Sequence, residues 1–210
     1  MTKLILARHG ETVWNVEKVF RGRADIALDD VGIKQAELLG KYLSNFKLQA
    51  IYSSPLRRAL DTASIIARYQ QLSVQDVEGL IDFDYGKWQS LTEPEVKRQY
   101  PTLYDEWLRN PHTIRMPEGE SLEDVRRRAL AAVEEVIAKY QGEVLLVSHR
   151  VVHKVLICSL LGLDNSHFWN IKLDVAGITI FDYADGRFIL AKHNDTSHLR
   201  ELRQPSLGDF

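Results

Sequence analysis

Residues 3–15 (KLILARHGETVWN) combine a strand-like run with side chains that can do chemistry. Residues 3–7 are mostly apolar, a pattern typical of a strand buried on both faces. Arg8, His9 and Gly10 follow directly, and ligands of open α/β sheets bind at the carboxyl ends of strands. This position favours a site where a ligand binds and chemistry takes place. A surface loop that happens to hold arginine and histidine is the alternative.

Three further stretches each follow or end a predicted strand: residues 53–63 (SSPLRRALDTA), 80–90 (LIDFDYGKWQS) and 144–150 (VLLVSHR). Together with RHGET and Asn15, and in this order, they resemble the histidine phosphatase superfamily, also called phosphoglycerate mutase-like. The first motif is highly specific and the second strong, whereas the third and fourth are altered. The resemblance covers nearly the whole chain. It implies phosphoryl transfer through a phosphohistidine, with no metal and no cofactor.

Phosphoryl transfer needs a nucleophile, cations around the equatorial oxygens and an acid for the leaving alkoxide. His9 is the candidate nucleophile, provided that the backbone near Gly10 accepts the proton of its other ring nitrogen. A structural or merely phosphate-contacting His9 is the alternative. Arg8 and Arg58 are the candidate clamp, because a guanidinium fork matches two phosphoryl oxygens. Arg57 competes with Arg58, and only the resemblance, which places the arginine before Ala59, selects between them.

His149 ends the second strong strand and could donate to the phosphoryl oxygens while His9 attacks. His153 lies four residues further on, so a zinc site on one helix face is a second reading. No glutamate of the HExxH type lies between them, and Arg150 would repel a metal ion. We therefore predict no metal site.

Asp82 is the candidate general acid. The resemblance implies a glutamate at this place, and aspartate is one carbon shorter and more acidic. It would need an apolar setting, which Phe83, Tyr85 and Trp88 could supply. Asp84 is the rival candidate for the acid; alternatively, it is a carboxylate that faces solvent beside the pocket.

The resemblance also implies a set of substrate contacts. It implies contacts from Asn15, Arg21 and Gly22, and we add Gly10 and Arg150 as candidate substrate-binding residues. Asn15 has a structural reading as well, at the end of a turn. Arg150 stands where relatives have glycine, so it would either crowd the pocket or contact the substrate. Glu120 is expected to brace the site rather than react, and the run Arg126–Arg127–Arg128 is expected to face solvent.

Composition narrows the class of protein. The 210 residues suit one domain, with 45% hydrophobic and 27% charged residues and a formal net charge of −2. This charge argues against nucleic acid or an acidic membrane as a partner, and we expect a small phosphorylated substrate instead. A single cysteine, Cys158, excludes an internal disulfide. The default expectation is a cytoplasmic protein, with a homodimer possible.

Strand-like and helical stretches alternate along the sequence. Helices are predicted over residues 31–46, 55–67, 93–109 with a break at Pro101, 121 onward and 151–161, and strands over 3–7, 50–53, 72–77 and 143–148. Residues 177–183 and 187–193 predict a hairpin around Asp185-Gly186. Residues 194–210 are expected to lie over the surface. The pattern predicts a three-layer α/β sandwich with a mostly parallel sheet, helices on both faces and a C-terminal hairpin.

The resemblance covers both hydrolases and cofactor-dependent mutases. It implies, for a mutase, an arginine directly after the acid and an arginine pair in a following insertion. Here Phe83 follows Asp82, Arg98 and Arg109 are isolated, and the chain is compact. We predict hydrolysis of a small phosphate monoester. A phosphoglycerate mutase and a weakly active module that binds a phosphorylated ligand are the alternatives.

Overall fold

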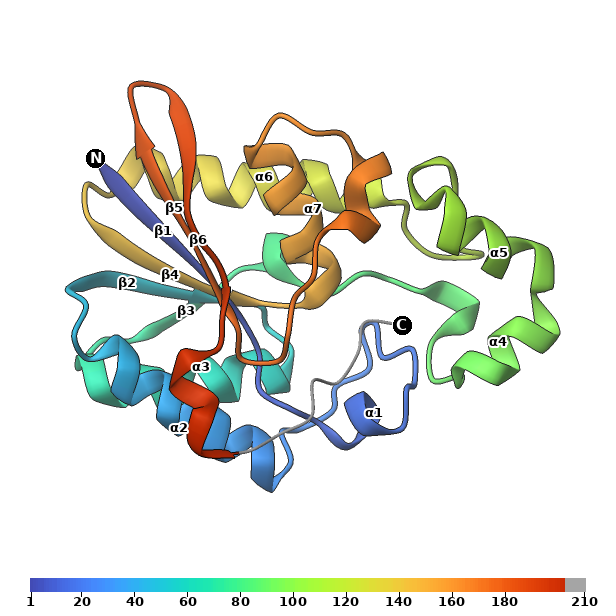
Figure 1. The fold of residues 1–210 in the computed structure, drawn as a ribbon, viewed down its shortest axis with the longest axis horizontal. Coiled ribbons are helices and arrows are strands. Elements are labelled where there is room, and N and C mark those ends of the chain that lie inside the picture. Colours follow the sequence, from blue (N-terminus) through green and yellow to red (C-terminus); the bar gives the residue numbers. More distant parts are fainter. Residues whose placement is uncertain (203–210) are drawn as a thin grey trace.

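The strands form one six-stranded sheet with helices on both faces (Figure 1). The structure, a computed structural model, describes residues 1–202. The strands are β1 Thr2–Arg8, β2 Leu48–Ser53, β3 Val74–Asp76, β4 Glu143–Ser148, β5 Ile178–Ala184 and β6 Arg187–Asp195. The α-helices are α1 Val13–Val16, α2 Asp30–Leu43, α3 Arg57–Gln70, α4 Glu93–Gln99, α5 Pro101–Arg109, α6 Leu122–Lys139 and α7 Arg150–Leu160. The 3-10 helices are η1 Glu78–Leu80, η2 Gly86–Trp88, η3 Pro111–Thr113, η4 Asn165–Asn170 and η5 Ser197–Leu202.

The sheet has the order β3-β2-β4-β1-β5-β6. Strands β1 to β4 pair in parallel, and the hairpin β5–β6 adds two antiparallel strands beside β1. Asp185 and Gly186 both have positive φ, at 51° and 75°, which suits the tight turn predicted there. The mostly parallel sheet and its C-terminal hairpin are confirmed.

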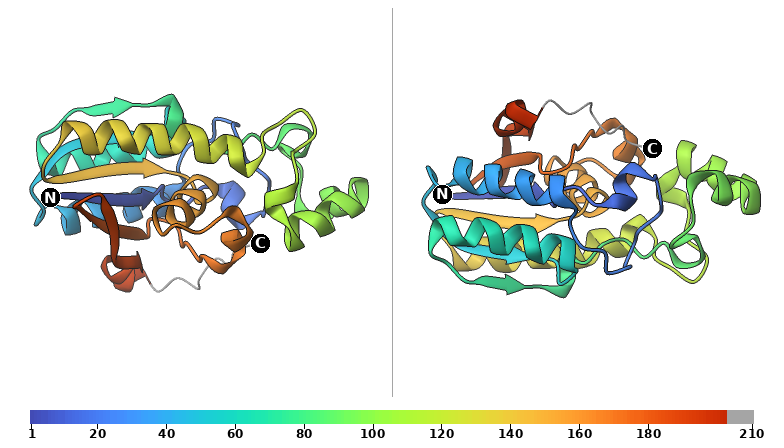
Figure 2. Two further views of the ribbon diagram at one scale, coloured as in Figure 1. Left: turned by 90° about the horizontal axis from the view of Figure 1, so that it is seen from above. Right: turned by 90° about the horizontal axis from the view of Figure 1, so that it is seen from below.

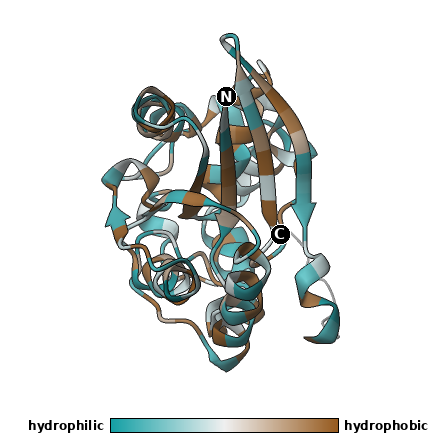
Figure 3. Ribbon diagram, turned by 90° about the vertical axis from the view of Figure 1, so that its left-hand side faces the viewer, coloured by the Kyte–Doolittle hydropathy of each residue, from teal (hydrophilic) through white to brown (hydrophobic). Residues whose placement is uncertain are grey.

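Two hydrophobic layers sandwich the sheet. In Figure 1, α2 and α3 lie below the sheet and α6 and α7 lie above it, and the two views of Figure 2 show each layer from outside. Leu4 and Leu6 of β1 belong to the upper core, whereas Ile5 and Ala7 belong to the lower one. Both faces of β1 are therefore buried, which explains its unbroken apolar run (Figure 3).

The register brings the carboxyl ends of three strands to one edge. Arg8 of β1 lies beside Ser148 of β4, and Ser53 of β2 lies beside Val147. His9, Ser54 and His149, which follow these strands, are consequently neighbours despite their separation in sequence.

Most differences from the predicted elements concern their ends. The loop 11–30 contains the short helix α1, whose cap is Thr12, and β3 is shorter than predicted. The break at Pro101 is confirmed, because it separates α4 from α5. After residue 194, β6 continues to Asp195 and η5 follows; residues 203–210 lie outside the described residues. Among the helices that the structure describes, none is long and apolar enough to cross a membrane.

A backbone contact between glycines fixes the loop after β1. A Cβ atom on Gly32, near the start of α2, would lie 2.1 Å from the carbonyl oxygen of Glu11. A Cβ on Gly10 would lie 2.5 Å from the carbonyl oxygen of Gly32. Only two residues without side chains allow α2 to approach the segment that carries His9 this closely.

We expect Gly32→Ala to destabilise the protein by about 1–3 kcal/mol, because the new methyl group overlaps backbone rather than a flexible side chain. Activity should fall as well, since the displaced Glu11 lies two residues from His9. Denaturant unfolding together with a phosphatase assay checks both effects. Lys34→Ala, at an exposed position in the same helix, is the control; equal stability of the two variants would contradict the prediction.

Candidate active site

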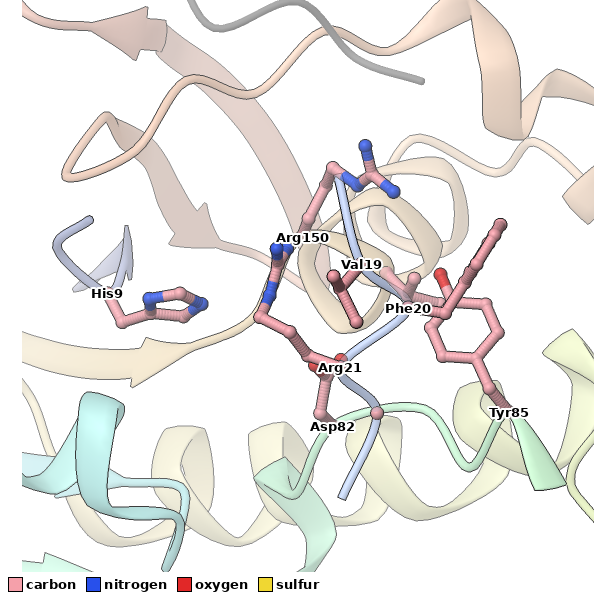
Figure 4. Close-up of a pocket in the computed structure, with 9 residues that line it drawn as sticks. His9, Val19, Phe20, Arg21, Asp82, Tyr85 and Arg150 are labelled. Carbon is pink, nitrogen blue, oxygen red and sulfur yellow. The ribbon is translucent and has the colours of Figure 1, made fainter. Parts of the chain in front are cut away.

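The strand ends lie beside a small pocket. Its lining comes from the loop after α1, the segment before η2 and the start of α7 (Figure 4). The lining residues are His9, Val19, Phe20, Arg21, Gly22, Asp82, Tyr85, Arg150 and Val151. The His9 and His149 rings lie with their centroids 5.2 Å apart, so the two predicted imidazoles meet.

His9 is held in one position and one tautomer. Its backbone N–H donates to Ser148 (3.0 Å), and its carbonyl accepts from Ala176 (3.1 Å). Ring atom Nδ1 lies 2.6 Å from the carbonyl oxygen of Gly10, which can only accept, so Nδ1 carries the proton. The lone pair is therefore on Nε2.

The charge state of His9 also suits a nucleophile. Burial lowers its pKa well below the usual value, and the guanidinium groups of Arg58, Arg8 and Arg21 lower it further. The imidazole is consequently neutral at neutral pH, with its Nε2 lone pair available.

The arginines come from separate elements. Arg8 ends β1 and donates to the carbonyl of Leu173 (2.6 Å). Arg58, in the first turn of α3, has no exposed surface and donates to the carbonyls of Gly22 and Ala24. Arg57 is exposed and lies 3.5 Å from Asp61, so Arg58 is the arginine of this pair that faces the site.

His149 contacts a residue that sequence reasoning missed. Its Nε2 lies 2.7 Å from Ser54 Oγ, and the same Oγ accepts from the backbone N–H of Leu56 (3.3 Å). Because Oγ accepts from Leu56, its O–H remains available to donate to His149 Nε2, which would leave the ring proton on Nδ1. Nδ1 lies 3.6 Å from Asp82 Oδ2, on the side of the pocket. His149 can thus offer an N–H to an anion there.

Asp82 and Asp84 are placed differently. Asp82 lines the pocket, accepting from Arg58 Nη2 through Oδ2 (2.8 Å) and from the Phe83 N–H through Oδ1 (2.8 Å). Asp84 instead accepts from the N–H of Gly86 and lies 3.6 Å from Arg23. The geometry favours Asp82 as the carboxyl group near a reacting ester.

Arg128 corrects one expectation about the charge run. Arg126 and Arg127 pair with Glu123 and Asp124 near the surface, as predicted. Arg128 does not face solvent: it binds both carboxylate oxygens of Glu120 and donates to the carbonyls of residues 79, 81 and 82. Its planar fork suits this set of acceptors. The position of Arg128 beside the buried stripe of α6 was the signal that could have identified it.

Glu120 therefore has a bracing role. Besides Arg128 it accepts from the N–H of Asp84 (3.0 Å), and it lies 3.2 Å from Arg23. These contacts hold the segment that carries Asp82 against α6.

The predicted substrate contacts divide into two groups. Arg21, Gly22 and Arg150 line the pocket. Asn15 and Gly10 lie outside the described lining: the Asn15 side chain accepts from Thr12 at the start of α1, and the Gly10 N–H donates to Thr62.

A metal site does not assemble from the described side chains. Within residues 1–202, no group of three or more histidine, cysteine, aspartate or glutamate residues is placed to hold a metal ion. His149 Nε2 faces Ser54, and burial lowers the pKa of His153 to about 3. His149, which precedes α7, and His153 within it are therefore not arranged as a zinc site.

We expect Ser54→Ala to lower kcat about 10- to 100-fold while KM changes little, because the tautomer of His149 is no longer fixed. Ser54→Thr keeps the hydroxyl and should restore much of the loss. Nitrogen-15 NMR of the histidine rings should show His149 protonated on Nδ1 in the wild type and mixed in Ser54→Ala. An unchanged His149 spectrum would contradict this role.

Proteins with similar sequences are phosphatases, which agrees with the phosphoryl-transfer chemistry that the geometry of the site allows. A model of the histidine phosphatase superfamily (branch 1) matches residues 4–196. Phosphoserine phosphatase 1 of Hydrogenobacter thermophilus is 38% identical over 203 residues, 96% of each chain. The metal-independent phosphoserine phosphatase of Arabidopsis thaliana is 30% identical, over 96% of this chain and 85% of its own.

Solved structures have the same fold. Bacillus stearothermophilus YhfR superposes with a TM-score of 0.91 and 35% identity, over 95% of this chain and all of its own. A phosphoserine phosphatase from Entamoeba histolytica in complex with 3-phosphoglyceric acid gives 0.84 and 31%, over 95% and 100%. The chain is a phosphoric monoester hydrolase and belongs to the histidine phosphatase superfamily.

Proposed function

We propose that the chain hydrolyses a small phosphate monoester without a metal ion, through a phosphohistidine on His9. The observation that carries this proposal is the hydrogen bond from His9 Nδ1 to the Gly10 carbonyl. It leaves the lone pair of Nε2 available to attack the phosphorus. Arg8, Arg58 and His149 surround the same point with positive charge or N–H donors. Preorganised donors of this kind stabilise the charge of a phosphoryl transition state.

In the first step, His9 Nε2 attacks the phosphorus and the bond from phosphorus to the ester oxygen breaks. The leaving alkoxide takes a proton from the carboxyl group of Asp82. The products of this step are an alcohol, a phosphoryl group on His9 and the carboxylate form of Asp82.

In the second step, a water molecule attacks the phosphorus and gives its proton to the Asp82 carboxylate. The bond between phosphorus and His9 Nε2 breaks, which returns the neutral imidazole and releases inorganic phosphate. The depressed pKa of His9 makes the imidazole a good leaving group without prior protonation.

The contact of Asp82 with Arg58 has a consequence for this cycle. Both oxygens of Asp82 accept hydrogen bonds, one from Arg58 and one from the Phe83 N–H. A bound phosphoryl group competes for the Arg58 guanidinium, and this competition frees Oδ2 to carry a proton toward the leaving oxygen.

The structure supports hydrolysis over mutase activity. Arg98 and Arg109, the arginines of the segment where a mutase would carry its pair, are both exposed and lie on α4 and α5. These helices project at the right of Figure 1, and neither arginine lines the pocket. Phosphoserine is the first substrate to assay, because the two relatives described above are named phosphoserine phosphatases.

His9→Ala should lower turnover of phosphoserine and p-nitrophenyl phosphate by at least about 10⁴-fold, because it removes the nucleophile. It should also abolish labelling of the protein by a radioactive phosphate ester. The assays are run with excess chelator, under which the wild type should keep its activity. His167→Ala, at a partly exposed histidine that is not in the pocket lining, is the control. Labelling that persists in His9→Ala would contradict the proposal.

Asp82→Asn should lower kcat for phosphoserine about 10²- to 10⁴-fold and spare p-nitrophenyl phosphate, whose leaving group needs no proton. Asp84→Asn is the matched control and should show no such difference between the two esters. Steady-state kinetics on both esters measures the effect. An equal loss on the two substrates in Asp82→Asn would count against its role as the acid.

A further inference from the structure

A second cavity lies away from the catalytic pocket, at the edge of the sheet where β3 lies beside α6 (Figure 2). Its volume is about 240 Å³, and it shares no lining residue with the catalytic pocket. The lining residues are Tyr52, Gln75, Val77, Leu80, Ala132, Glu135, Val136, Lys139 and Leu146. The two proposed reaction steps use none of these residues.

The inner part of this cavity is apolar. Leu80 and Leu146 have almost no exposed surface, and Ala132 and Val136 are buried as well. An apolar cavity of about 150 Å³ can hold a benzene molecule, so the volume here takes a ligand of roughly ten non-hydrogen atoms. An aliphatic group placed here would leave water for an apolar surrounding, which is favourable. The inner surface therefore favours a small ligand with an apolar body.

The outer edge of the cavity carries a positive charge beside two hydroxyl groups. Lys139, in the last turn of α6, is exposed, and its Nζ lies 5.2 Å from the centroid of the Tyr140 ring. The hydroxyls of Tyr52 and Tyr140 lie 3.3 Å apart. Interaction with both hydroxyls raises the pKa of Lys139, so its amine is charged at neutral pH. Lys139 and Tyr52, which both line the cavity, can together bind a carboxylate.

The same edge also carries a negative charge. Glu135 lies four residues before Lys139, on the same face of α6, and also lines the cavity. Both side chains belong to the described part of the chain, and they form no ion pair with each other there. A carboxylate at this point opposes a purely anionic ligand and can accept hydrogen bonds from an ammonium group. An ammonium and a carboxylate on one carbon atom would complement the two charges.

We infer that this cavity is a second binding site, for a free amino acid with a small apolar side chain such as leucine. The apolar side chain would enter the inner cavity, the carboxylate would contact Lys139 and Tyr52, and the ammonium would contact Glu135. The inference goes beyond the proposed function and does not depend on it, because it concerns binding at residues outside the catalytic pocket.

Titration of the full-length protein with leucine tests the inference. Calorimetry should show saturable binding with a Kd below about 1 mM. Nitrogen-15 NMR should show shift changes at the backbone amides of η1 and of the last turns of α6. Saturating inorganic phosphate, a probe for the catalytic pocket, should leave the Kd for leucine unchanged.

Three analogues each remove one recognised feature of leucine. 4-Methylpentanoate lacks the ammonium group, 3-methylbutylamine lacks the carboxylate, and serine lacks the apolar body. Each should bind at least about 10-fold more weakly than leucine, because one cavity feature is left without its complement.

Variants of the lining assign the binding to this cavity. Lys139→Gln and Glu135→Gln, both at exposed positions, should each raise the Kd for leucine about 10-fold or more. Ala132→Leu places a side chain in the inner cavity and should abolish binding. Glu134→Gln, at an exposed position of α6 outside the lining, is the control and should keep the wild-type Kd. Thermal unfolding checks that each variant is folded.

No saturable binding of leucine up to about 10 mM would overturn the inference. So would a Kd that Lys139→Gln and Glu135→Gln leave unchanged, or competition between leucine and inorganic phosphate. Binding of 4-methylpentanoate as tight as that of leucine would overturn the assignment to amino acids. Each of these results leaves the proposed function intact, since that function is tested by the His9 and Asp82 variants.

Discussion

The burial of several positive charges around two neutral imidazoles is the constraint on which the rest of this structure depends. An unpaired guanidinium in a protein interior is strongly destabilising, so each one needs acceptors close by. The chain supplies backbone carbonyls for this purpose: Leu173 for Arg8, Trp14 for Arg21, and Gly22 with Ala24 for Arg58. The loops that provide these carbonyls are thereby fixed around the pocket. Guanidinium groups gathered at one pocket are suited to bind the oxygens of a phosphorylated ligand.

The need to gather these groups at one pocket explains why the strand register and the loop contacts of the sheet are closely constrained. The parallel strands β1, β2 and β4 bring His9, Ser54 and His149 to one edge, where the register leaves no room for a slip. Glycines at positions 10 and 32 allow α2 to press against the loop after His9. On the opposite side, the Glu120–Arg128 pair ties the Asp82 segment to α6. The proposed acid, Asp82, and the proposed nucleophile, His9, are thus positioned by separate layers of the sandwich.

The sequence predicted the parts of this site that depend on local pattern. The apolar run before Arg8 predicted a doubly buried strand, and the Gly10 carbonyl was expected to fix the His9 tautomer, which the geometry agrees with. The choice of Arg58 over Arg57 needed the family resemblance, because neighbouring positions at a helix start cannot be ranked by periodicity alone.

What the sequence did not predict depends on contacts between distant segments. Ser54 and His149 are 95 residues apart, and nothing in the local sequence of residues 53–55 marks Ser54 as a partner of a histidine. Arg128 sat within a run of three arginines, and the run as a whole is typical of a solvated helix face. Its place beside the apolar stripe of α6 is a weak signal, and the packing of α6 against η1 and the Asp82 segment supplies the carbonyl acceptors that hold Arg128.

The central claim is that the phosphoryl group passes through Nε2 of His9. Its most direct test is phosphorus NMR of the enzyme quenched in alkali during turnover, with mass spectrometry of its peptides to locate the phosphate. We predict a phosphoryl group on the peptide that contains His9. It should be attached at Nε2, because Nδ1 donates a hydrogen bond to the Gly10 carbonyl. Phosphate on Nδ1 or on His149, or turnover with no phosphorylated histidine at all, would contradict this account.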